Sequence, residues 1–80
     1  MAHEVDGQGN IKVFTFTVLY DLGEESKRRF VDYADGWAWA RGIVVEYEAQ
    51  ADDHSARIYW DYEWIPEEQV EDYISEINED

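Results

Sequence analysis

The strongest constraint on the fold is the segment 11–20, which is apolar on both of its alternating faces. Its β-branched and aromatic residues favour a strand. Successive side chains of a strand point to opposite faces, so Phe14 and Phe16 share one face while Ile11 and Val13 share the other. The pattern therefore predicts a central strand of a sheet.

Residues 24–41 have the spacing of a helix, because apolar side chains recur at one helical face. The residues of that face are Phe30, Ala34, Trp37, Ala38 and Arg41. Gly36 disfavours the helix by about 1 kcal/mol, which predicts a break or kink there, and Gly42 suits a left-handed stop. The basic cluster at 27–29 would lie early in this helix and pair with Glu24 and Glu25.

Two further segments, 43–50 and 56–64, alternate between apolar and polar residues and predict a hairpin around the turn 52–55. Its outer face would be acidic, with Glu46, Glu48, Asp61 and Glu63 around Tyr59. The aromatic residues expected in the core are Phe14, Phe16, Trp37, Trp60, Tyr62 and Trp64. Trp39 cannot share a helix face with Trp37, so Trp39 and Tyr59 are the candidate anchors of an interface.

A last helix is predicted to open at Ile65-Pro66, since proline is tolerated in the first turn. Its apolar stripe consists of Val70, Tyr73, Ile74 and Ile77. These elements predict one acidic α+β domain over residues 1–80, with 1–10 as a tail or hairpin arm. The expected architecture is a two-layer sandwich: a mainly antiparallel sheet of three or four strands, with two helices on one face. The expected order is β-α-β-β-α, with room for an extra N-terminal strand.

Charge limits the possible functions more than any motif does. The chain of 80 residues has 20 acidic and 6 basic residues, no cysteine, and a formal net charge of −14. Such a surface repels nucleic acid and anionic lipid, so direct binding to either is not expected. The apolar runs are too short for a membrane span or a signal peptide. These features predict a soluble protein of a reducing compartment, the cytoplasm.

The acidity is concentrated in the second half of the chain. Residues 1–41 have a net charge of −2 and residues 42–80 a net charge of −12. Adaptation to high salt would spread carboxylates over the whole surface, whereas a recognition surface would concentrate them. The predicted last helix has like-charge pairs at i, i+4, such as Glu68 with Asp72, and acids at its negative end. Together these lower the local stability of the helix by about 1–2 kcal/mol. This asymmetry favours recognition.

No constellation for catalysis is present in the sequence: the serines lack a nucleophile-elbow context and no glycine-rich phosphate loop occurs. Asp52-Asp53-His54 offers oxygen and imidazole ligands, but these residue types are also typical of a solvated turn. We therefore expect no enzymatic activity, no cofactor and no metal.

Size, acidity, the absence of cysteine and the acidic stripe of the last helix together resemble small acidic inhibitors carried by phages and mobile elements. These include DNA-mimicking anti-CRISPR and anti-restriction proteins. The resemblance implies the bacterial host cytoplasm as the location if a phage encodes the chain. The resemblance implies a non-catalytic monomer or homodimer that binds the cationic nucleic-acid site of a basic protein or complex. The candidate partner-binding residues are Trp39, Glu46, Glu48, Tyr59, Asp61, Glu63, Glu67, Glu68, Glu71, Asp72 and Glu76. An immunity protein or antitoxin against a basic nuclease, and a salt-adapted domain, are the alternatives.

Overall fold

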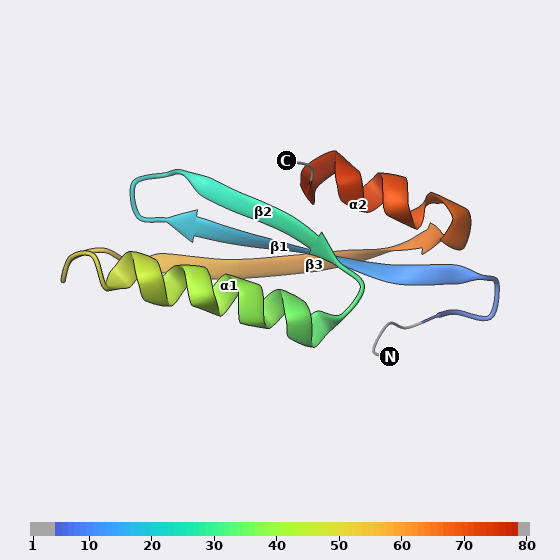
Figure 1. Ribbon diagram of the computed structural model, residues 1–80, viewed down its shortest axis with the longest axis horizontal. Helices are drawn as coiled ribbons and strands as arrows, with labels where there is room; N and C mark the ends of the chain where they lie inside the picture. The colour runs from blue at the N-terminus through green and yellow to red at the C-terminus, as the bar shows by residue number, and fades with distance from the viewer. Residues whose placement is uncertain (1–4, 79–80) are drawn as a thin grey trace.

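A long central strand organises the molecule, which is a computed structural model that describes residues 5–78 (Figure 1). The elements are β1 (Asn10–Tyr20), β2 (Glu25–Phe30), α1 (Tyr33–Glu48), β3 (Ala56–Pro66), the 3₁₀ turn η1 (Glu67–Gln69) and α2 (Val70–Asn78). The three strands form one antiparallel sheet in the order β2-β1-β3. The predicted α+β class, the antiparallel sheet and the central position of β1 are confirmed.

The predicted element order is wrong between residues 24 and 50. The observed order is β-β-α-β-α, because residues 25–30 form a strand paired with β1 and not the start of a helix. Gly23, at φ 96°, allows the tight turn that reverses the chain. The Tyr20 N–H donates to the Glu24 carbonyl at 2.8 Å, so the turn closes directly into the strand ladder.

Helix α1 occupies much of the segment that was predicted as the strand 43–50. Its N-cap is Asp32, whose side chain accepts a hydrogen bond from the Ala34 N–H at 3.0 Å. The residues of α1 that pack on the sheet core are Trp37, Trp39, Ala40, Ile43 and Val44. The strand interpretation placed Val45 in the core, but this residue is 63% exposed. The alternation at 43–47 is therefore incidental to a helical stripe.

Neither glycine acts as the sequence predicted, since α1 continues through Gly36 and Gly42 without a break. Gly36 is buried against β1. A Cβ at this position would lie 2.1 Å from Phe16 Cε1, so only glycine allows the helix to approach the ring this closely. Nothing lies within 4 Å of a Cβ built at Gly42.

The two helices cover opposite faces of the sheet, which corrects the prediction of two helices on one face. Helix α1 packs against Phe14, Phe16 and Val18. Helix α2 packs through Val70 against Ile11, Val13 and Ile65. Even-numbered and odd-numbered residues of β1 point to opposite faces, so the core is split into two clusters. The physical reason is that both faces of β1 are apolar and each needs its own cover.

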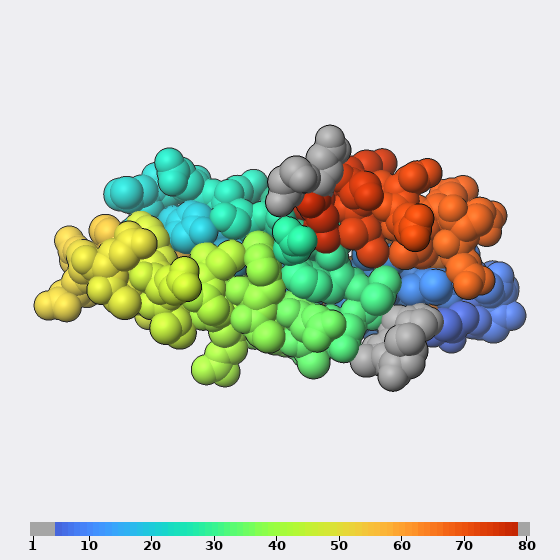
Figure 2. All heavy atoms as spheres, viewed as in Figure 1, coloured from blue at the N-terminus to red at the C-terminus, as the bar shows by residue number. Residues whose placement is uncertain are grey.

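The helices are also staggered along the strands. Figure 1 shows α1 beside one end of the sheet and α2 beside the other. The molecule measures 47 × 21 × 18 Å and is visibly elongated in Figure 2. Each face of the sheet is consequently covered along only part of its length. Within residues 5–78, no helix is long and apolar enough to cross a membrane.

Candidate functional site

The acids of η1 and α2 form an exposed row. Val70, Tyr73 and Ile74 face the sheet, as their helical spacing predicted. The carboxylates occupy the remaining surface of this segment, and all of them are exposed: Glu67, Glu68, Glu71, Asp72 and Glu76. Helix geometry separates successive carboxylates at i, i+4 by about 6 Å along the axis.

Contacts from β2 hold this helix in place. The backbone N–H of Arg29 donates to Asn78 Oδ1 at 2.7 Å, and Asn78 Nδ2 donates to the Arg29 carbonyl at 2.8 Å. The Arg29 guanidinium lies 3.6 Å from the centre of the Tyr73 ring and donates to the Tyr73 carbonyl. Its Nη1 also lies 3.3 Å from Glu76 Oε1. The basic cluster 27–29 thus lies on a strand, where Arg29 anchors α2 and Lys27 pairs with Glu25 at 3.6 Å.

Two acids of β3 join the row from the same face of the sheet. The Tyr73 hydroxyl donates to Glu63 Oε1 at 3.0 Å, which places Glu63 beside α2. Burial and this hydrogen bond raise the pKa of Tyr73. Asp61 and Tyr59 share the face of Glu63 by alternation. We call this set of predicted residues the acidic face; it comprises Tyr59, Asp61, Glu63, Glu67, Glu68, Glu71, Asp72 and Glu76.

The structure does not bring Glu46, Glu48 or Trp39 to the acidic face. Glu46 and Glu48 lie in the last turns of α1, which covers the opposite face of the sheet, not on a hairpin as predicted. Trp39 is half-buried, with its ring centroid 5.7 Å from that of Phe30. The expected anchor Tyr59 is 49% exposed and accessible to a partner.

An aromatic strip was missed by the sequence interpretation, which placed its residues in the core. Trp60, Tyr62 and Trp64 of β3 are 42%, 47% and 41% exposed. They lie on the face that α1 covers. The first residue of α1, Tyr33, contacts Trp60 with ring centroids 4.9 Å apart, and Tyr62 and Trp64 lie toward the end of β3 beyond this helix. Lys12 Nζ lies 4.2 Å from the centre of the Tyr62 ring, so the strip already holds a cation of its own chain. The sequence feature that could have indicated this exposure is the length of β3, which is greater than one helix covers.

A hydrogen bond between a carboxylate and a phenol connects the end of α1 to the β1–β2 turn. The Tyr47 hydroxyl donates to Asp21 Oδ1, and the Tyr47 ring stacks on His54 with centroids 4.5 Å apart. The hydrogen bond from Tyr47 lowers the pKa of Asp21, and the same bond raises the pKa of Tyr47 to about 12. This contact ties the last turns of α1 to the β1–β2 turn.

Stability at alkaline pH should depend on this contact. The phenol of Tyr47 has a pKa of about 12 in the folded chain, against an ordinary value of 10.0. Its contribution to folding stability is therefore complete below pH 10.0 and is lost as pH rises through about 12. In Asp21→Ala, the pKa of Tyr47 should fall toward 10.0. NMR titration of the Tyr47 ring carbon measures this, with Asp53→Ala as the control that leaves the pKa high. An ordinary pKa in the parent chain would contradict the contact.

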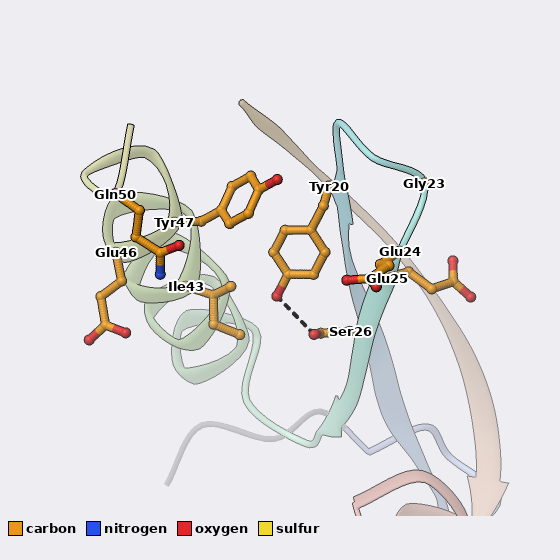
Figure 3. Close-up of a pocket in the computed structure, with 9 residues that line it drawn as sticks. All are labelled: Tyr20, Gly23, Glu24, Glu25, Ser26, Ile43, Glu46, Tyr47 and Gln50. Atoms are coloured by element: carbon orange, nitrogen blue, oxygen red, sulfur yellow. Dashed lines mark hydrogen bonds between the residues drawn. The ribbon is translucent and has the colours of Figure 1, made fainter. Parts of the chain in front are cut away.

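An open groove of about 860 Å³ lies at the same end, between α1 and the β1–β2 turn (Figure 3). The Tyr20 and Tyr47 rings contact each other in its lining, tilted by 56° with centroids 4.7 Å apart (Figure 3). Tyr20 Oη and Ser26 Oγ are hydrogen-bonded at 2.9 Å. Three carboxylates line the groove, from Glu24, Glu25 and Glu46. Their negative charge favours a cationic ligand over an anionic one.

The turn residues Asp52-Asp53-His54 form part of the loop between α1 and β3 rather than a hairpin turn. His54 Nδ1 lies 3.8 Å from Asp53 Oδ1. Among residues 5–78, no three side chains of the types that bind metals gather closely enough to hold an ion. Comparison with known proteins yields no matching family model, no matching curated sequence and no matching solved structure.

Proposed function

We propose that this protein is a non-catalytic acidic binding protein that occupies the cationic nucleic-acid site of a partner protein. Carboxylates of the acidic face would take the places of phosphates. The proposed partner is a nucleic-acid-binding complex of bacterial defence, as for the anti-CRISPR and anti-restriction inhibitors that the chain resembles. The observation that supports this function is the acidic face itself, which gathers exposed carboxylates from β3, η1 and α2 on one side of the molecule.

The charge density of the molecule supports the proposal. Glu4, Glu79 and Asp80 lie outside the described residues, which leaves 17 acids and six bases in residues 5–78, a net charge of −11. Along the 47 Å axis, that is about one net charge per 4 Å, against about one per 3.4 Å for one DNA strand. A cationic channel would attract such a rod strongly at low salt.

The acidic face is also held rigidly before any partner binds. Helix α2 is fixed by the paired hydrogen bonds between Arg29 and Asn78, and Glu63 accepts a hydrogen bond from Tyr73. Side chains on ordered elements lose less conformational entropy when they bind than those on a loose tail. A preformed row of charges is therefore better suited to competing with nucleic acid than a disordered acidic segment.

Capture from bacterial lysate tests this function. The full chain is immobilised at about 0.1 M salt, where the Debye length is about 10 Å, and bound proteins are eluted by a salt step. We expect a nucleic-acid-binding protein that added duplex DNA displaces from the column.

A bound protein that DNA does not displace would contradict the proposal. Recovery of a basic nuclease whose activity the chain neutralises would assign the immunity-protein alternative. An empty column, together with a melting temperature that rises steadily with salt, would assign the acidity to salt adaptation.

A further inference from the structure

The outer edge of β3 has hydrogen-bonding groups that the sheet does not use. Within residues 5–78, β3 is an edge strand, since the sheet order is β2-β1-β3. The register between β1 and β3 is unbroken, and a hydrogen bond beyond each end shows which residue pairs are bonded. At one end the Asp21 N–H donates to the Ser55 carbonyl, and at the other the Glu67 N–H donates to the Gly9 carbonyl. In an antiparallel ladder, hydrogen-bonded pairs alternate along the strand. The odd-numbered residues of β3 therefore bond to β1, and the even-numbered ones point their N–H and C=O groups outward.

This edge is long and aromatic. It extends over Ala56–Pro66, and Trp60, Tyr62 and Trp64 are exposed beside it. Edge strands of this kind are usually shortened, covered or protected by lysine or proline, because they pair readily with another strand. Here the only proline of the strand is Pro66, its last residue. The edge is thus available for strand pairing along most of its length.

We propose that a second copy of this chain binds at this edge, with the two β3 strands antiparallel and related by a two-fold axis at Trp60. The two sheets then form one continuous sheet of six strands. Trp60 pairs with Trp60 of the second copy, Ile58 with Tyr62, and Ala56 with Trp64. All of these residues have outward N–H and C=O groups, so the ladder closes without needing an N–H from Pro66.

Charge complementarity favours this register over a shift of the axis to Asp61. Pairing about Trp60 places Glu63 opposite Arg57 of the second copy, twice by symmetry, and places Asp61 opposite Tyr59. Arg57 and Glu63 are both exposed on the same face of β3. A shift of the axis to Asp61 would instead place the two Asp61 carboxylates opposite each other, which is unfavourable. That register would also require a hydrogen bond from the backbone nitrogen of Pro66, which has no N–H to donate.

The stagger of the helices makes the two copies complementary in shape. Helix α1 covers the part of its face that includes Ala56 and Ile58 and ends at Trp60, which leaves Tyr62 and Trp64 open. Antiparallel pairing sets the first half of one β3 beside the second half of the other. The α1 helix of each copy then lies next to the aromatic strip of the other copy, and the α2 helices are related in the same way on the opposite face.

The exposed aromatic area fits an interface of this kind. Trp60, Tyr62 and Trp64 are between 41% and 47% exposed. At roughly 200 Å² per aromatic side chain, the two copies together could bury about 500 Å² from these residues alone. A stable interface buries about 1,200–2,000 Å² in total, and the strand edges and flanking helices supply further area.

Analytical ultracentrifugation of the full chain tests the assembly, with a mass of twice 9.5 kDa expected. The charge-swap variants Arg57→Glu and Glu63→Arg test the register. Each alone places like charges opposite each other twice, so we expect the dissociation constant to rise about tenfold or more. An equimolar mixture of the two variants restores both opposite-charge pairs and should dimerise as the parent does. Glu71→Arg, away from the edge, is the matched control and should not change the mass.

A parent chain that remains at 9.5 kDa up to millimolar concentration would overturn the proposal. A dimer that neither charge swap weakens would assign the interface to another surface and overturn it as well. If the chain is monomeric but its β3 amide resonances shift on addition of oligo-arginine, the edge binds a basic extended peptide instead of a second copy. Circular dichroism of each variant shows whether the fold is retained.

Discussion

The Gly36→Ala variant is expected to lose about 1–3 kcal/mol of unfolding free energy, the cost of overpacking a filled core. The added methyl group would lie 2.1 Å from Phe16 Cε1 and 2.3 Å from Cδ1. Phe16 is fully buried, and the rings of Phe30, Tyr33 and Trp37 surround it at centroid distances of 6.0, 5.7 and 5.9 Å. The ring therefore cannot move aside without displacing its neighbours. This strain outweighs the gain of about 1 kcal/mol that alanine normally brings to a helix.

Gly42→Ala is the matched control, because it makes the same change in the same helix with nothing within 4 Å of the new methyl group. It should raise the unfolding free energy by about 0.5–1 kcal/mol. Urea denaturation measures both variants, and their midpoints should move in opposite directions from that of the parent. A Gly36→Ala variant at least as stable as Gly42→Ala would show that α1 does not approach β1 this closely.

Reversing three charges of the acidic face, Glu68→Lys, Glu71→Lys and Asp72→Lys, should weaken binding to the cationic partner about 100-fold. The change takes the net charge from −14 to −8 and places repulsive groups where the partner expects phosphates. Relief of like-charge pairs returns about 0.2–0.5 kcal/mol each, while lysine at the start of α2 opposes the helix dipole by about 0.3–1 kcal/mol per charge. The fold should therefore survive with a modest loss of stability. Calorimetric titration against the captured partner measures the effect.

Net charge alone could weaken binding, so the control applies the same change at the other end of the molecule. Glu46→Lys, Glu48→Lys and Asp52→Lys also give a net charge of −8 but leave the acidic face intact. This variant should bind within a few-fold of the parent. Equal losses in the two variants would mean that the partner responds to total charge and not to the acidic face.

The sequence predicted the parts of the fold in which one periodicity dominates. The two apolar faces of 11–20 indicated a central strand, and the stripe from Val70 to Ile77 indicated both α2 and the exposure of its acids. Between residues 24 and 50 the apolar residues fit both the two-residue period of a strand and the period of about 3.6 residues of a helix. Ile43, Val45 and Tyr47 alternate as in a strand, while Ile43 and Tyr47 also recur at helical spacing. The local pattern cannot distinguish a helix from a strand here. Packing against Phe14, Phe16 and Val18 of β1 selects the helix.

The candidate site followed the same division. Asp61 and Glu63 were correctly placed with one face of β3, since alternation within a strand is a local property. Glu46 and Glu48 were misplaced together with the segment that contains them. The exposure of Trp60, Tyr62 and Trp64 depends on how far α1 extends over the sheet. That is a property of the assembled molecule and not of any segment.

Because the core is split into two clusters, we expect the molecule to unfold as two cooperative units. Helix α2 is held by the cluster of Ile11, Val13 and Ile65 and by its contacts with Arg29. Helix α1 is held by the cluster on the other face, around Phe16. The two clusters share the backbone of β1 but have no buried side chain in common. Helix α2 can therefore detach in a local unfolding event that leaves the larger cluster closed, with a free energy below that of global unfolding.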